Sequence, residues 1–298
     1  MPTNPEARSE INSKPQSNLV LGSIFMVIAF LANTLQSAFA KAIAAEVSVE
    51  TFTWLTFLIA LLIVLPLIIL RRGRDLRTQV FKFHLLRGLS GLTAFYCFIF
   101  AVKLINLVNA NVLLNTTPIF IPLIALIFLK QRVIPSLWWA IAVGFMGMII
   151  VVKPDASIMG RPGDLLGLAA GIVAAFEFLT VKHLDRSESP LTQLFYFLVI
   201  GSVLSTPLAL SHFTNLDLQS WLFMLASAVA LVSFQFLLIK AYTYAKPHEI
   251  GIFQYSSVVF ASLIGWVSFG EVLDLSTTIG IALICFGGIL TILLQRPA

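Results

Sequence analysis

Ten apolar runs, each about the length of a membrane-spanning helix, limit what this chain can fold into. They cover residues 19–41, 51–70, 84–104, 108–129, 137–152, 164–182, 191–211, 219–240, 248–269 and 276–294. A helix needs about 20 apolar residues to cross the hydrocarbon core of a bilayer. The composition agrees, since 58% of the residues are hydrophobic and only 11% are charged. The sequence therefore predicts an all-α membrane protein with ten transmembrane helices.

Lysine and arginine residues gather at one end of these runs. Fifteen of the 19 fall on the side of the amino terminus. Because short cytoplasmic loops carry the excess of positive charge, we expect both termini in the cytoplasm. The polar residues 1–18 predict a disordered cytoplasmic tail. The chain has no basic stretch interleaved with aromatic residues, so we expect no nucleic-acid partner.

Two segments repeat each other across the middle of the chain. The stretch 115–118 (NTTP) aligns with 255–258 (YSSV) within a gap-free match at an offset of 140 residues. We expect two halves of five helices each, over 19–153 and 164–295. Because five is odd, the two halves must lie in opposite orientations in the membrane. Inverted repeats of this kind are typical of secondary transporters, whose substrate sites lie between the halves.

The stretch LRGLSGLTAFYCFIFAVKLINLVNANVLLNTTPIFIPLIALIFLKQR (86–132) resembles the third and fourth helices of the drug/metabolite transporter superfamily, EamA type. The second copy carries Glu271, where the family habitually has a glutamate, but the first copy has Gln131. The resemblance implies two inverted five-helix repeats in the bacterial inner or plasma membrane. It also implies a central cavity lined largely by helices 3, 4, 8 and 9.

Polar residues at helical spacing mark the candidate substrate site. One face of the fourth helix carries Asn111, Asn115, Pro118 and Pro122, at steps of four, three and four. We expect the two prolines to act as hinges. The predicted substrate-binding residues, from helices 1, 3, 4, 8 and 9, are Asn33, Tyr96, Asn111, Asn115, Gln235, Gln254 and Tyr255. The alternative role for these side chains is hydrogen bonding between helices.

Glu177 is the only acidic residue that these spans place well inside the membrane. An intramembrane carboxylate is a candidate for proton coupling. The alternatives are a neutral, hydrogen-bonded carboxyl or a pair with a lysine such as Lys240. Gly163, Gly167 and Gly171 form a stripe of small residues that predicts close helix packing. The histidines and cysteines lack metal-ligand spacing, so we expect no metal and no cofactor.

These features favour a carrier of a small organic solute, such as an amino acid, a similar metabolite or a drug-like compound. It would work by alternating access, either coupled to protons or as an exchanger. A flippase for lipid or lipid-linked sugar is the alternative with the same fold. An intramembrane enzyme is the alternative of another class, but Glu177 has no nucleophile or base beside it in the sequence. The expected partners are the solute and the bilayer, and a monomer is plausible.

Overall fold

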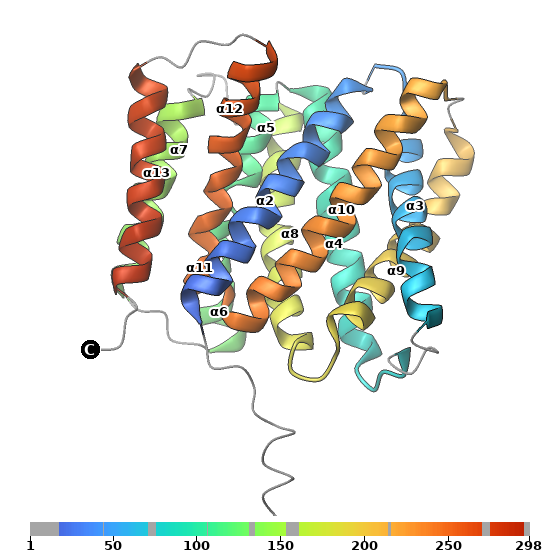
Figure 1. Ribbon diagram of the computed structural model, residues 1–298, viewed down its shortest axis with the longest axis horizontal. Coiled ribbons are helices and arrows are strands. Elements are labelled where there is room, and N and C mark those ends of the chain that lie inside the picture. The colour runs from blue at the N-terminus through green and yellow to red at the C-terminus, as the bar shows by residue number, and fades with distance from the viewer. Residues whose placement is uncertain are drawn as a thin grey trace, which may run out of the picture.

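The computed structural model describes residues 18–43, 45–70, 76–105, 107–130, 135–152, 161–213, 216–269 and 275–294. Every regular element within these ranges is a helix (Figure 1). Seven helices are long and apolar enough to cross a membrane: α2 (Leu19–Ala42), α3 (Val49–Leu70), α4 (Phe81–Leu104), α8 (Pro162–Leu184), α9 (Pro190–Ser211), α10 (Leu218–Tyr244) and α13 (Leu275–Leu294). A shorter apolar helix is α7 (Pro135–Val152).

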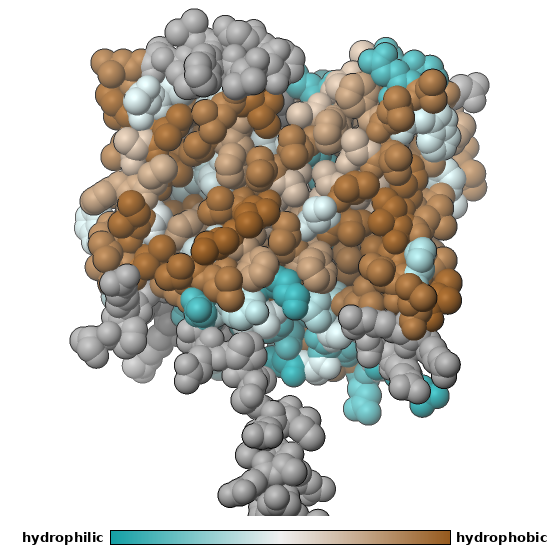
Figure 2. All heavy atoms as spheres, in the orientation of Figure 1, coloured by the Kyte–Doolittle hydropathy of each residue, from teal (hydrophilic) through white to brown (hydrophobic). Residues whose placement is uncertain are grey.

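Large apolar side chains cover the outside of this bundle. Leu70, Trp139 and Leu222, from three different helices, are all exposed. Figure 2 shows a broad apolar band across the molecule, with hydrophilic residues toward its two ends. Helices suit such surroundings because each one satisfies its own backbone hydrogen bonds. The fold is therefore that of a helical membrane protein.

Local signals place the helix starts. The Asn18 side chain accepts a hydrogen bond from the Leu21 backbone N–H at 3.0 Å and caps α2. Ser189 and Asp217 cap α9 and α10 in the same way. Asn18, the last residue of the predicted tail 1–18, is therefore the N-cap of the first described helix. Its other residues, 1–17, lie outside the described ranges.

The helices pack in pairs that are distant in sequence. The most extensive contacts join α2 to α10, α4 to α8, α7 to α13 and α3 to α9. Figure 1 shows α7 and α13 side by side at one edge of the bundle. In the centre, the Phe30 ring lies edge-on to Phe234 and Phe178, with ring centroids 5.4 and 6.5 Å apart. The main core therefore joins α2, α8 and α10.

Two of the ten expected spans are interrupted rather than continuous. The span 108–129 is divided into α5 (Leu107–Leu114) and α6 (Thr117–Leu129). The span 248–269 is divided into α11 (Pro247–Ile250), the 3₁₀ segment η3 (Gly251–Tyr255) and α12 (Ser256–Phe269). Both interruptions lie beside the candidate site.

Candidate functional site

The break between α5 and α6 follows from the residues at its centre. Pro118 has no N–H to donate to the Leu114 carbonyl, so that acceptor is left free. The Thr117 hydroxyl lies 2.6 Å from the Leu114 carbonyl oxygen and 3.0 Å from that of Gly171 on α8. The Thr116 hydroxyl donates to the Leu113 carbonyl at 2.6 Å. The Thr117 hydroxyl thus replaces the backbone donor that the proline lacks, and the Thr116 hydroxyl adds a hydrogen bond to the preceding carbonyl.

The second copy is interrupted without a proline. Here a 3₁₀ segment, η3, replaces the α-helix over Gly251–Tyr255. It ends at Tyr255, the counterpart of Asn115 at the first break. The two interrupted helices also meet, since the Ser257 hydroxyl lies 3.4 Å from the Asn115 Oδ1. The Thr34 hydroxyl of α2 lies 3.4 Å from the Ser257 carbonyl oxygen. The centre of the bundle therefore holds two interrupted helices in contact.

A central cavity lies against this junction. Its empty space, including the part open to the outside, amounts to about 700 Å³. Its walls come from α2, α3, α4, α5, α8, α9, α10 and η3. Its polar lining consists of Asn33, Gln36, Ser37, Glu177, Gln235 and Gln254. Seven phenylalanines supply most of the rest, namely Phe30, Phe52, Phe95, Phe98, Phe178, Phe197 and Phe234. The cavity is thus aromatic, with a few polar groups.

Two amide side chains in this lining each have a buried atom without a hydrogen-bond partner among the described residues. Gln36 is 5% exposed and Gln254 is 1% exposed. The Gln36 Nε2 and the Gln254 Oε1 lack a partner among the described residues. Buried polar groups in folded proteins are almost always hydrogen-bonded. The lining of the cavity thus includes one residue with an unpaired donor and one with an unpaired acceptor among the described residues.

Glu177 lies on the cavity wall and belongs to a buried polar network. The Gln235 Nε2 donates to the Glu177 Oε1 at 3.0 Å. The Gln235 Oε1 accepts from the Arg87 guanidinium at 2.8 Å. The guanidinium also donates to the Gln193 backbone carbonyl at 2.6 Å, and its carbon lies 4.9 Å from the Phe197 ring centre. The amide of Gln235 thus stands between a buried cation and a buried carboxylate.

Gly91 makes room for this network on α4. A Cβ atom at this position would lie 2.4 Å from the Phe197 ring and 3.0 Å from the Glu177 carboxyl carbon. Both distances are too short for ordinary contact. Only a residue without a side chain therefore lets α4 approach Glu177 and Phe197 this closely.

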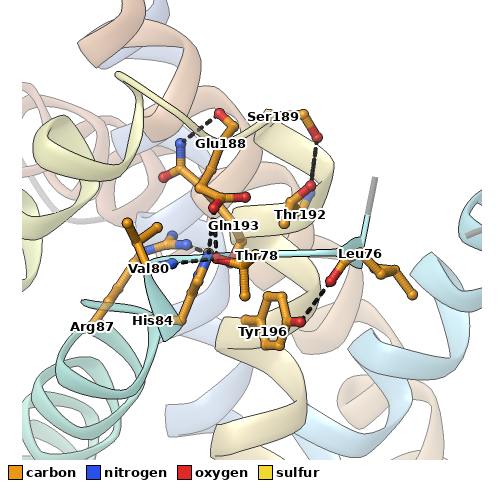
Figure 3. Close-up of polar contacts among 10 residues, drawn as sticks. All are labelled: Leu76, Thr78, Val80, His84, Arg87, Glu188, Ser189, Thr192, Gln193 and Tyr196. Atoms are coloured by element: carbon orange, nitrogen blue, oxygen red, sulfur yellow. Dashed lines mark hydrogen bonds and ion pairs between the residues drawn. The ribbon is translucent and has the colours of Figure 1, made fainter. Parts of the chain in front are cut away.

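A second polar cluster joins the connections that enter α4 and α9, and we call it the latch (Figure 3). It consists of Leu76, Thr78, His84, Glu188 and Tyr196. The Thr78 hydroxyl donates to the Glu188 carboxylate at 2.6 Å, and the His84 Nε2 lies 3.8 Å from the same oxygen. The Tyr196 hydroxyl donates to the Leu76 carbonyl at 2.7 Å. The latch thus ties the start of α4 to the start of α9.

The cavity includes some of the predicted substrate-binding residues and not others. Asn33, Gln235 and Gln254 line it. The lining does not include Tyr96, whose ring stacks on Phe100 with centroids 6.2 Å apart. The side chain of Asn111 lies outside the described residues, as do Gln131 and Glu271.

The structure places Asn115 and Tyr255 in helix packing rather than on the cavity wall. Asn115 is 2% exposed and contacts Ser257, as described above. The Tyr255 ring packs against α7, where a Cβ on Gly144 would lie 2.8 Å from it. The cavity lining includes the residues just before them, Leu114 and Gln254, and not Asn115 or Tyr255.

The other predicted residues lie along the same junction. Pro118 begins α6, and Pro122 lies inside it. Each of the three glycines of α8 lies so close to a neighbouring segment that an added Cβ atom would be in very short contact with it. A Cβ on Gly163 would lie 2.8 Å from Ile105, one on Gly167 3.0 Å from Leu113, and one on Gly171 2.7 Å from the Thr116 hydroxyl.

Arg87 is the main residue that the sequence reasoning misses. It is one of the fifteen lysines and arginines on the side of the amino terminus, and it is completely buried. It lies six residues beyond the start of α4, or about 9 Å into the helix. Glu177 lies seven residues before the end of α8, at a similar depth. Opposite charges at matching depths are a signal that could have revealed the pair, since intramembrane charges usually have partners.

The fold and the cavity define a helical membrane protein with an internal site for a small molecule, and comparison with known proteins narrows this class. The model of the EamA-like transporter family matches residues 20–153 and again 161–293. The chain therefore belongs to the EamA-like transporter family, and it is a membrane transporter.

Characterised relatives are similar along nearly the whole chain. The pseudopaline exporter CntI of Pseudomonas aeruginosa (strain UCBPP-PA14) is 25% identical over 88% of this chain and 93% of its own. An S-adenosylmethionine uptake transporter of Rickettsia bellii is 24% identical, with coverage of 89% and 90%. A riboflavin transporter of Vibrio cholerae is 27% identical, with coverage of 84% and 86%. One solved crystal structure shares the fold, with a TM-score of 0.76, 20% identity and coverage of 94% and 98%.

Proposed function

We propose that this protein is a secondary transporter that carries a small organic solute across the bacterial inner membrane by alternating access. The solute would be an amino acid, a similar metabolite or a drug-like compound, and it would occupy the central cavity. The observation that carries the proposal is the unpaired, buried amides of Gln36 and Gln254 on the cavity wall. The relatives named for S-adenosylmethionine and riboflavin add these two compounds to the solutes to be tested.

The pairing of helices supports ten spans in two inverted repeats, over 19–153 and 164–295. In this numbering α2, α3, α4 and α7 are spans 1, 2, 3 and 5. The helices α8, α9, α10 and α13 are spans 6, 7, 8 and 10. The contact of spans 1 and 8 then has its counterpart in the contact of spans 6 and 3. Contacts of span 2 with 7 and of span 5 with 10 map onto themselves. This is the pattern that a two-fold axis between inverted halves would produce.

The distribution of closed and open space supports alternating access. The latch ties α4 and α9 together at the end that the charge pattern assigns to the cytoplasm. On the opposite side, a smaller hollow shares Ala40, Phe52 and Ile99 with the cavity and continues to Lys103. Transport would then require the latch to separate while the walls near Lys103 close. Both termini would be cytoplasmic in this arrangement.

Glu177 is the candidate for coupling to protons. It is buried at 5% exposure, lies on the cavity wall, and has one hydrogen-bonded oxygen. A carboxyl in this position can exchange a proton with the cavity when the cavity is open. In Glu177→Gln vesicles we expect transport that no longer depends on a pH gradient. An unchanged pH dependence would exclude Glu177 as the coupling group.

The decisive experiment is a transport screen with the purified full-length chain in liposomes. Amino acids, nucleosides, sugars, S-adenosylmethionine and riboflavin would be tested in uptake and in counterflow. For any transported solute, we expect Gln254→Leu to reduce transport by about tenfold or more, because the solute loses a buried hydrogen bond. The stability should not fall, since the Gln254 Oε1 has no hydrogen bond from the described residues to lose. Transport that survives in Gln254→Leu and in Gln36→Leu would place the solute elsewhere.

A further inference from the structure

We propose that the solute is a flat organic cation, with its ring between the phenylalanines of the cavity and its positive group beside Glu177. The inference rests on the proposed transport function and specifies the substrate class of the same cavity. Three observations carry it: the charge of the lining, the position of Arg87 and the aromatic walls.

The charge of the lining favours a cation. Glu177 is the only ionisable residue among the described residues that line the main cavity. Its Oε1 accepts from Gln235, and no other hydrogen bond to its carboxylate joins it to the described chain. A carboxylate in a buried site with one hydrogen bond is poorly compensated. A positive group on the solute would supply a second partner for it.

Arg87 does not offer the cavity an equivalent positive group. Its guanidinium lies behind Gln235, is completely buried and does not line the cavity. Two of its nitrogens already donate to oxygens, and Phe197 covers the face of the guanidinium. An anionic solute would therefore meet Glu177 without reaching Arg87. This arrangement disfavours a solute whose only charge is a carboxylate.

The walls favour a flat ring. Phenylalanine faces carry the negative part of the ring quadrupole and attract cations, most strongly where water is excluded. The protein already uses one of these rings in this way, because Phe197 lies 4.9 Å from the Arg87 guanidinium carbon. Phe178, directly next to Glu177 in the chain, lies edge-on to Phe30 with centroids 6.5 Å apart. An aromatic cation can contact the rings and the carboxylate at the same time.

The test compares three two-ring solutes of nearly equal shape and different charge. These are N-methylquinolinium (a cation), quinoline (neutral at pH 7.5) and 1-naphthoate (an anion). Binding to the purified full-length chain would be measured by titration calorimetry. We expect N-methylquinolinium to bind about tenfold more tightly than quinoline, and 1-naphthoate most weakly. Glu177→Gln should remove the advantage of the cation over quinoline, both measured in the same variant, while Glu177→Asp should preserve this advantage.

A second variant guards against loss of binding through misfolding. Gln36→Glu keeps the size of the side chain and adds a second carboxylate to the wall. It should increase the preference for N-methylquinolinium over quinoline, both measured in the same variant, by about tenfold. Equal binding of all three solutes, preference for 1-naphthoate, or no response to Gln36→Glu would overturn the cation proposal. The transport proposal would still stand on its own screen, which uses solutes of every charge.

Discussion

The network around Arg87 and the wall of the cavity both contain buried glutamine side chains, but these side chains differ in what they bond to. Around Arg87, the guanidinium donates to the Gln193 carbonyl and to Gln235, with distances of 2.6 and 2.8 Å. On the cavity wall, the amide groups of Gln36 and Gln254 have unpaired atoms among the described residues. Glutamine side chains therefore link charged groups in one region and carry unpaired groups in the other, although the Arg87 Nε and the Gln193 Oε1 also lack a partner among the described residues.

This comparison suggests a working rule for the bundle. A buried polar group that the chain satisfies is part of the closed structure, and its removal should affect stability. A buried polar group that the chain leaves unsatisfied should affect binding and transport more than stability. The rule also requires that the unsatisfied group faces the cavity. Each part of it can be tested with one substitution.

The largest effect is expected from Arg87→Met. The change leaves the Gln193 carbonyl and the Gln235 amide without their donor, and Glu177 without a nearby cation. Removing one partner of a buried charged network typically costs about 3–5 kcal/mol. Thermal and denaturant unfolding of the purified protein in detergent would measure the loss. Arg77→Met, at an exposed position before α4, is the matched control and should change stability by less than about 0.5 kcal/mol.

A small loss of stability in Arg87→Met, comparable to that in Arg77→Met, would contradict the view that Arg87 connects the latch end to the cavity. Transport by the variant should also fall, since Gln235 and Glu177 line the cavity and lose their support.

Much of the fold follows from the sequence, because lipid requires long apolar runs and helices. The sequence indicated a hinge near Pro118, which removes a backbone donor, but the expected span 108–129 was continuous and not divided into α5 and α6. The break at η3 was not indicated, because Gly251–Tyr255 contains no proline and its 3₁₀ form depends on packing against α2, α6 and α7.

The site was harder to predict than the fold. Spacing along one helix identifies a polar face, but it does not say whether that face meets a cavity or another helix. Asn115 contacts another interrupted helix. Gln254, the residue before Tyr255, lines the cavity, and Tyr255 is the counterpart of Asn115 in the second repeat. The aromatic walls were also hidden, because seven of 25 phenylalanines come together only through contacts between distant helices.

A moderate effect is expected from Thr78→Val, which tests the latch directly. The change removes the hydroxyl that donates to Glu188 and accepts from the Val80 backbone N–H. A hydrogen bond to a charged group contributes about 1.5–3 kcal/mol, so the stability should fall by about 2 kcal/mol. Amide hydrogen exchange over residues 76–84 should accelerate, because the start of α4 is less firmly held. Gln79→Ala, at an exposed neighbouring position, is the control, and equal exchange in the two variants would argue against the latch.

The smallest effect is expected from Tyr255→Phe, which tests whether an unpaired polar atom must face the cavity. The Tyr255 hydroxyl is buried and has no partner among the described residues, as is true of an atom in Gln254. Unlike Gln254, however, Tyr255 does not line the cavity. We therefore expect unchanged transport and a stability that is equal or higher by up to about 1 kcal/mol, measured as for Arg87→Met.

The ring of Tyr255, in contrast to its hydroxyl, should matter for packing. Gly144→Ala places a Cβ 2.8 Å from this ring, and overpacking of this kind typically costs about 1–3 kcal/mol. If Gly144→Ala lowers the stability while Tyr255→Phe changes neither stability nor transport, then Tyr255 acts through the packing of its ring. Reduced transport in a stable Tyr255→Phe would instead mean that the hydroxyl meets the solute. The distinction between Tyr255 and Gln254 would then fail, because lining the cavity in this conformation would no longer identify the groups that bind the solute.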